Sequence, residues 1–216
     1  MKPEMTEWTI VIPGLWNERI FTPEWITKYL YVDDPKKIEI EIPAQSGLPF
    51  RFIFGNLLLI PQSDRIIVGL KTLDDDTLKR AEELALKILE TLPHTPIFSF
   101  GINFGFDLSN HPEFAALFNT MDIKDLSENR FEIIGSEIKH TLKQTVGQLN
   151  LKLSVSPLEP SKLKIHLNFH HPVDSATTAK SQLTNHVMEC KRICYDVIQK
   201  VYKLRPEGED TNGTEN

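Results

Sequence analysis

The stretch IFSFGINFGFDL, Ile97 to Leu108, alternates large apolar side chains with small or polar ones. The apolar set is Phe98, Phe100, Ile102, Phe104 and Phe106, and the other set is Ser99, Gly101, Asn103, Gly105 and Asp107. Successive side chains of a strand point to opposite faces, so the pattern predicts a strand with one buried face. One-sided burial favours antiparallel pairing. Glycines inside a strand allow bending or the close approach of another backbone.

Three further stretches show the same alternation: KIEIEIP from Lys37, GQLNLKLSVS from Gly147 and KLKIHLNFHH from Lys162. Their predicted inward residues are Ile38, Ile40, Ile42, Leu149, Leu151, Leu153, Val155, Leu163, Ile165, Leu167 and Phe169. Their predicted outward residues are Glu39, Glu41, Asn150, Lys152, Ser154, Lys164, His166, Asn168 and His170. The sheet is therefore expected to have one covered face and one polar face.

Two long helices are predicted from apolar residues at helical spacing. The first spans Asp74–Leu92, and the three aspartates at its start suit the positive end of the helix dipole and a cap. The second runs without a break from Ser175 to Leu204, with an apolar stripe through Ala179, Leu183, Val187, Cys190, Cys194, Val197 and Val201. At this length it is expected either to cross a whole sheet or to extend beyond it towards a partner.

A duplication is predicted from the order of elements. Pro23-Glu24-Trp25 and Pro112-Glu113-Phe114 each open a short helix, with proline where its missing N–H costs nothing. The first half reads as strand Thr9–Pro13, helix Pro23–Tyr31, strands Lys37–Ile42, Pro49–Ile60 and Arg65–Lys71, then helix Asp74–Leu92. The second reads as strand Ile97–Leu108, helix Pro112–Asn119, strands Arg130–Lys143, Gly147–Ser156 and Lys162–His170, then helix Ser175–Leu204.

The predicted fold is therefore α+β, built from tandem β-α-β-β-β-α units over residues 1–93 and 94–204, with a disordered tail over 205–216. Joining the halves edge to edge would give one curved sheet with helices on one face and an open, concave polar face. The saddle of the TATA-binding protein has a comparable order of elements, which is an analogy of topology and not a family assignment. Two separate sheets remain the alternative.

Composition restricts the partners. The net charge of −6 and the pI of about 5.7 argue against a nucleic-acid backbone or an anionic membrane as the main partner. No apolar run approaches the roughly 20 residues that span a bilayer, and the acidic N-terminus does not resemble a secretory signal, so a cytoplasmic location is expected. Cys190 and Cys194 are interpreted as small buried hydrophobes in a reducing compartment; a metal pair or a redox couple is the alternative, with no supporting ligands nearby. No cofactor or metal is predicted.

The usual signatures of catalysis and phosphate binding are missing from the sequence. The best cluster is HLNFHHPVD, with His166, His170, His171 and Asp174, which is interpreted either as surface histidines or as part of a site. The speculative ligand-binding residues are Asn103, Lys152, His166 and His170, all predicted on the polar face. No catalytic residue is assigned.

Charge on the predicted polar face is uneven. Lys139, Lys143, Lys152 and Lys164 make the second half cationic, whereas Glu39 and Glu41 make the first half acidic. This distribution suits self-association or an uneven ligand, and it is also compatible with plain solvated strands. The expected function is a non-catalytic binding or protein-interaction protein that uses the open sheet face or the long C-terminal helix, and its expected partner is another protein or a second copy in a homodimer. The alternative is a small-ligand sensor or enzyme on the polar face of the second half.

Overall fold

A computed structural model describes residues 1–30, 38–42, 49–108, 111, 114, 117–118, 129, 135–145, 147–156 and 159–204, without the side chains of 156 and 159–162. The predicted helix Pro112–Asn119, the strand start at Arg130 and the tail from Arg205 lie wholly or largely outside these residues.

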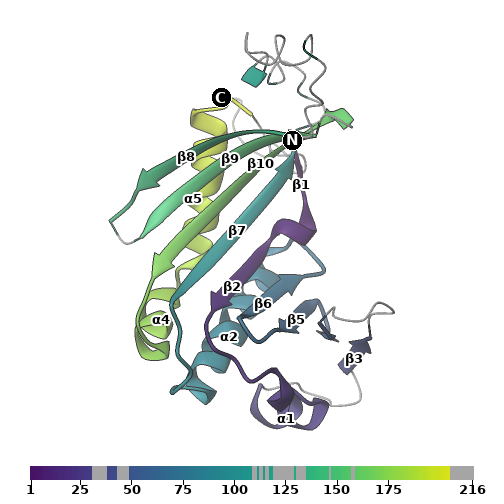
Figure 1. Cartoon of the computed structure of the whole chain (residues 1–216), viewed down its shortest axis with the longest axis vertical. Helices are drawn as coiled ribbons and strands as arrows, with labels where there is room; N and C mark the ends of the chain where they lie inside the picture. Colours follow the sequence, from purple (N-terminus) through teal and green to yellow (C-terminus); the bar gives the residue numbers. More distant parts are fainter. Residues whose placement is uncertain are drawn as a thin grey trace, which may run out of the picture.

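All the strands that the structure describes belong to one sheet, so the alternative of two separate sheets is wrong (Figure 1). Its order is β3-β4-β5-β6-β2-β7-β10-β9-β8, and β1 pairs with β7 beside this path. The strands are β1 (Lys2–Pro3), β2 (Thr9–Pro13), β3 (Ile38–Glu41), β4 (Arg51–Phe54), β5 (Leu57–Pro61), β6 (Arg65–Leu70), β7 (Ser99–Asp107), β8 (Ser136–Lys143), β9 (Gln148–Ser156) and β10 (Glu159–Pro172). Every pairing is antiparallel, as the one-sided alternation predicts.

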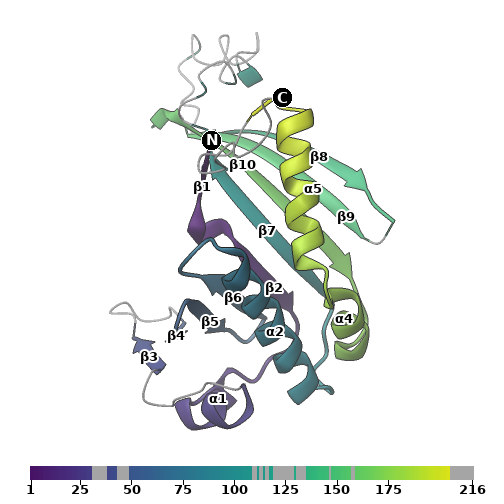
Figure 2. The same cartoon turned by 180° about the vertical axis from the view of Figure 1, so that it is seen from behind.

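The long helices lie on one face of the sheet (Figure 2). The helices are α1 (Pro23–Tyr29), α2 (Asp75–Thr91), α4 (Ala176–Leu183) and α5 (Val187–Lys200), with short 3-10 turns η1 (Met5–Glu7) and η2 (Glu18–Ile20). Helix α2 packs on β2, β5 and β6, and α5 packs on β7. Because α2 also contacts α4 and α5, the helices of the two halves form one continuous layer. The α+β class is thus confirmed.

A cluster of aromatic side chains fills the core where the two halves meet. Trp8 is almost fully buried, and its ring meets Phe104 and Phe106 edge to face, at centroid separations of 4.9 and 5.6 Å. Tyr195 of α5 closes the cluster at 6.5 Å from Trp8. The indole Nε1–H of Trp8 donates to the carbonyl of Gly105 at 3.0 Å, so this large buried side chain leaves no polar atom unpaired.

The predicted single strand Pro49–Ile60 is wrong. The chain turns at Gly55, where φ is +59°, and forms the hairpin of β4 and β5. The first half therefore has four strands between α1 and α2. Phe98 also departs from the prediction: it is exposed, because Ile97 forms the bridge to Gly14 and the regular alternation begins only at β7.

The predicted unbroken helix Ser175–Leu204 is wrong as well. Helix α4 ends at Leu183 and α5 begins at Val187, with Asn185 between them at φ +59°. Asparagine tolerates this left-handed conformation, which ends the first helix and redirects the chain. The predicted apolar stripe is buried from Ala179 to Cys194. Beyond that point the buried residue is Ile198, whereas the predicted Val201 is exposed.

Each half pairs its first strand with its last, β2 with β6 and β7 with β10. That shared connectivity agrees with a duplication, although the extra strand in the first half breaks the predicted identity of order. The duplication itself stays a prediction.

Gly147 provides a test of the β8–β9 connection. Its φ is +76°, and an added Cβ would lie 2.3 Å from the carbonyl oxygen of His170. We expect Gly147→Ala to destabilise the fold by about 2 kcal/mol or more, because backbone strain and the clash act together. Gly135→Ala is the matched control, since an added Cβ there meets no atom within 4 Å. Urea unfolding of both variants checks this, and equal free energies of unfolding would contradict it.

The predicted cap of α2 is confirmed at Asp74. Its Oδ1 accepts from the Thr77 N–H at 2.7 Å, and its Oδ2 accepts from the Thr72 and Thr77 hydroxyl groups. These bonds, the Thr72 hydroxyl first, lower the pKa of Asp74 from 3.8 to about 2. They stabilise the charged form of a residue whose side chain satisfies one of the free N–H groups at the start of α2, that of Thr77.

The lowered pKa predicts a pH dependence of stability. Because the folded-state pKa lies below the unfolded value of 3.8, the contribution of Asp74 is complete only at about pH 5 and above, and it is lost as the pH falls towards 2. Asp74→Asn can still cap the helix but carries no charge. We expect the difference in free energy of unfolding between wild type and Asp74→Asn to shrink steadily from pH 5 to pH 2. A difference that stays constant over this range would refute the assignment.

Candidate functional site

The open face of the sheet carries a row of amide and hydroxyl side chains across five neighbouring strands. Thr141 donates to Asn150 Oδ1 at 3.0 Å, Asn150 donates to Asn168 Oδ1 at 3.1 Å, and Asn168 donates to Asn103 Oδ1 at 2.7 Å. Asn103 then donates to Thr9 Oγ1 at 3.1 Å. We name these five residues the polar ladder. Its hydrogen bonds all run in one direction, an arrangement in which each bond polarises the next.

Glycines make room for this face. A Cβ on Gly101 would lie 2.9 Å from the side-chain nitrogen of Asn168, and a Cβ on Gly105 would lie 2.3 Å from Glu7 Cβ. The predicted close approach of another backbone is confirmed at Gly105, over which the short η1 turn passes.

The charged residues of the second half mostly have partners. Lys152 Nζ lies 3.1 Å from Glu137, and Lys164 Nζ lies 2.7 Å from Glu4. His166 Nε2 is 3.7 Å from Glu7 Oε2, beyond a good hydrogen bond. Burial lowers the pKa of His166, and the Glu7 carboxylate opposes this only in part.

All four predicted site residues lie in this region. Asn103 belongs to the polar ladder, and His166 and Lys152 are direct cross-strand neighbours, with His170 one step beyond the ladder. His166 and Lys152 line a pocket of about 110 Å³ together with Glu4, Glu7 and Lys164. That volume is roughly that of a few water molecules. The residues therefore share a face, but the pocket is small and both of its lysines already have a carboxylate partner.

A second cluster lies on the covered face and was not predicted from the sequence. His171, His186 and Cys190 bring their ligand atoms within 4.8 Å of one another. His171 follows Phe169 in the inward alternation of β10, and its ring stacks on Phe100 at 4.5 Å. His186 is the residue before α5, and Cys190 lies one helical turn further along. The expectation that Cys190 has no potential ligands nearby is therefore wrong.

The polar atoms of this cluster face each other. His171 Nε2 and His186 Nε2 are 3.2 Å apart, and His186 Nδ1 is 3.3 Å from Glu189 Oε2. Burial is the main cause that lowers the pKa of His171 to about 4, so its ring is neutral at pH 7. Burial also raises the pKa of the Cys190 thiol, assisted by the carboxylates of Glu189 and Glu82. Both effects follow from the cost of holding charge in an apolar core.

Glu82 holds the helix break in place. Its two carboxylate oxygens accept from the backbone N–H groups of Asn185 and Val187, although Glu82 is itself almost fully buried. A carboxylate at the first turn of α5 satisfies free amides and favours the helix dipole. The sequence signal available for this cluster was the four-residue spacing of His186 and Cys190, which places them on one side of a helix. Using that signal required knowing that the helix breaks at Asn185.

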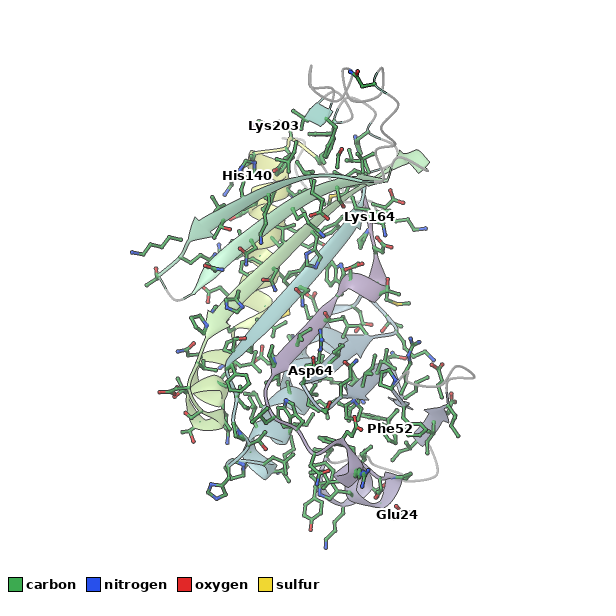
Figure 3. All side chains as sticks on the ribbon, viewed as in Figure 1. Glu24, Phe52, Asp64, His140, Lys164 and Lys203 are labelled. Atoms are coloured by element: carbon green, nitrogen blue, oxygen red, sulfur yellow. The ribbon has the colours of Figure 1, made fainter. Side chains whose placement is uncertain are left out.

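A third feature is a groove at the far end of the first half. It has a volume of about 840 Å³ and lies between the start of α1 and the side of β3 and β4 that carries Ile40 and Phe52. Figure 3 labels Phe52 and Asp64, which both line it, and shows His140 at the other end of the sheet. Ile40, Ile42 and Phe50 are 43, 73 and 55% exposed there, so several large apolar side chains meet solvent in one place.

The two ends of the sheet differ in charge. Strand β3 is the last strand at one edge and presents Glu39 and Glu41, while β8 is the last at the other and presents Lys139 and Lys143. The uneven charge predicted from the sequence is thus placed on opposite edges of one sheet.

No protein-family model matches the chain, and no curated protein matches it. In the part of the chain that the structure describes, no helix has the length and apolar character needed to cross a membrane.

The polar ladder yields a stability prediction. Asn168→Ala removes the middle residue of the polar ladder. Asn103, which is only 9% exposed, then loses the side-chain donor to its Oδ1. We expect a loss of about 1 to 2 kcal/mol in the free energy of unfolding. Thr141→Ala, at the exposed end, should cost less than about 0.5 kcal/mol. Thermal or urea unfolding distinguishes the two, and an equal effect would mean that the ladder is not a connected unit.

Proposed function

We propose that this chain is a non-catalytic binding protein, and that it docks an extended segment of a partner protein along the free edge of β3. The observation that carries the proposal is the exposed apolar groove beside an edge strand with the sequence Ile-Glu-Ile-Glu. Among the described strands, β3 pairs only with β4, so its other edge offers free backbone donors and acceptors. Strand addition uses such an edge for affinity and an adjacent groove for specificity.

The charge on β3 selects the partner. A docked strand would place every second side chain beside Glu39 and Glu41, and the others beside Ile40 over the groove. The neighbouring strand β4 already pairs a basic residue with a glutamate of β3, because Arg51 stands opposite Glu41 with 3.7 Å between the charged groups. We therefore infer a partner segment in which apolar and basic residues alternate, since opposite charges across strands stabilise pairing.

A second copy of the chain fits less well. Antiparallel pairing of β3 with β3 of another copy would bring Glu39 opposite Glu41, which repels. Pairing of β3 with β8 of another copy offers opposite charges. However, β3 and β8 are the first and last of nine strands that are each antiparallel to the next, so β3 and β8 run in the same direction. Copies with the same face up would then form a parallel pair, the less stable kind.

The other two surfaces have less in their favour. The polar ladder and the flanking ion pairs already use much of the hydrogen-bonding capacity of the open face. The long C-terminal helix is two helices, and α5 packs on the sheet. A small-ligand site at Asn103, Lys152, His166 and His170 remains the alternative, limited by the 110 Å³ pocket. A cytoplasmic setting belongs to the proposal, in keeping with two free, buried cysteines.

Charge reversal on β3 tests the proposal. The probe is a short labelled peptide in which valine and lysine alternate, and its binding is followed by fluorescence anisotropy. We expect wild type to bind it, and Glu39→Lys/Glu41→Lys to weaken binding about tenfold, which two lost cross-strand ion pairs would give. The same variant should gain affinity for a peptide that alternates valine and glutamate.

Matched controls separate strand addition from general attraction to an acidic protein. Lys139→Glu/Lys143→Glu reverses the charge of the opposite edge and should leave peptide affinity nearly unchanged. Ile42→Ser should weaken binding, whereas Val201→Ser, at an equally exposed site on the helix end, should not. Equal binding of a peptide with its lysines in one block would overturn the proposal. Dimerisation of wild type that is lost in Glu39→Lys/Glu41→Lys, seen by sedimentation, would replace it with self-association.

A further inference from the structure

The cluster of His171, His186 and Cys190 has the composition of a metal site. Imidazole nitrogen and cysteine sulfur are the ligands that zinc prefers, and three protein ligands plus a water complete its usual tetrahedral shell. The three come from two separate elements, β10 and the start of α5, and are held there by the packing of the core. His171 and Cys190 are fully buried, and the side chain of His186 is 20% exposed, which leaves a path to solvent on one side.

The distances agree with this chemistry. Two nitrogens bound to one zinc ion at 2.0–2.1 Å and a tetrahedral angle are about 3.3 Å apart. His171 Nε2 and His186 Nε2 are 3.2 Å apart. The ligand atoms of the two histidines and of Cys190 all lie within 4.8 Å of one another, so a small inward movement of the side chains would close the site.

The surroundings also favour a cation. Glu189 lies 3.3 Å from His186 Nδ1, the position from which a carboxylate commonly orients a metal-bound histidine. When Nδ1–H donates to Glu189, Nε2 presents its lone pair to the centre of the cluster. Glu82, from α2, adds a buried carboxylate near the start of α5, although its oxygens are bound to backbone amides.

We propose that His171, His186 and Cys190 bind a zinc ion that links the end of β10 to the start of α5. The two histidines each give a nitrogen lone pair. Cys190 loses its thiol proton to solvent and binds as the thiolate, and a water completes the shell. One proton is therefore released for each ion bound, and no oxidation or reduction takes place.

Cobalt(II) is the first probe, since a cobalt–thiolate bond gives a charge-transfer absorption in the near ultraviolet. Protein is prepared reduced and free of metal, then titrated with cobalt and afterwards with zinc. We expect the absorption to saturate at one equivalent and to disappear when zinc displaces cobalt. Zinc should also raise the midpoint of thermal unfolding, because it binds the folded state. Absence of the absorption, together with no retained zinc in native mass spectrometry, would overturn the proposal.

The second cysteine provides a matched control. Cys190→Ser should abolish the absorption, whereas Cys194→Ser removes an equally buried thiol outside the cluster and should leave it unchanged. His186→Asn is the second variant. His186 is the most exposed of the three ligands, so we expect this substitution to preserve folding. Glu189→Gln should weaken zinc binding by roughly tenfold without removing it. An absorption that survives in Cys190→Ser or disappears in Cys194→Ser would refute the assigned ligands.

Discussion

The pairing of β2 with β7 is the interaction on which the whole architecture depends. Only Thr9, Ile10 and Val11 pair there with Asn103, Ile102 and Gly101, yet this short contact turns two sets of strands into one sheet. So short a ladder needs support from both faces. On the covered face Trp8 packs on Phe104 and Phe106, and on the open face Asn103 bonds to Thr9. Fusion also protects the two strands from being free edges, and it leaves β3 and β8 as the ends of the sheet.

Local pattern was sufficient for the described strands of the second half. Alternation placed Phe100 through Phe106 and Ile165 through Phe169 correctly, because a one-residue shift would move each side chain to the wrong face. It failed where a single residue changes the direction of the chain. Gly55 and Asn185 both adopt positive φ, and each divides an apolar run that seems continuous in sequence. Such a turn does not disturb the period on either side, so periodicity alone cannot detect it.

The candidate site residues followed the same rule. Asn103, Lys152, His166 and His170 were found because they share the outward side of the alternation, which is a local property. Which partners they have is not local: Glu4 and Glu7 reach this face from the N-terminal segment, far away in sequence. The cluster at Cys190 was missed for a related reason. His171 continues the inward register of β10, so a polar ring stands where the pattern leads one to expect an apolar one.

A fully buried histidine such as His171 has a desolvation cost that a core residue does not normally carry. His171 is neutral and stacked on Phe100, and among the described residues its Nδ1 has no hydrogen-bond partner. An apolar side chain at this position would avoid that desolvation cost. The break at Asn185 is likewise supported by a buried carboxylate, Glu82, which would be unnecessary in a continuous helix. The buried histidine and the helix break lie at the same point, where β10 and α5 converge. An ion bound by His171, His186 and Cys190 would offset the desolvation cost of His171. The helix break provides the geometry that such an ion would use.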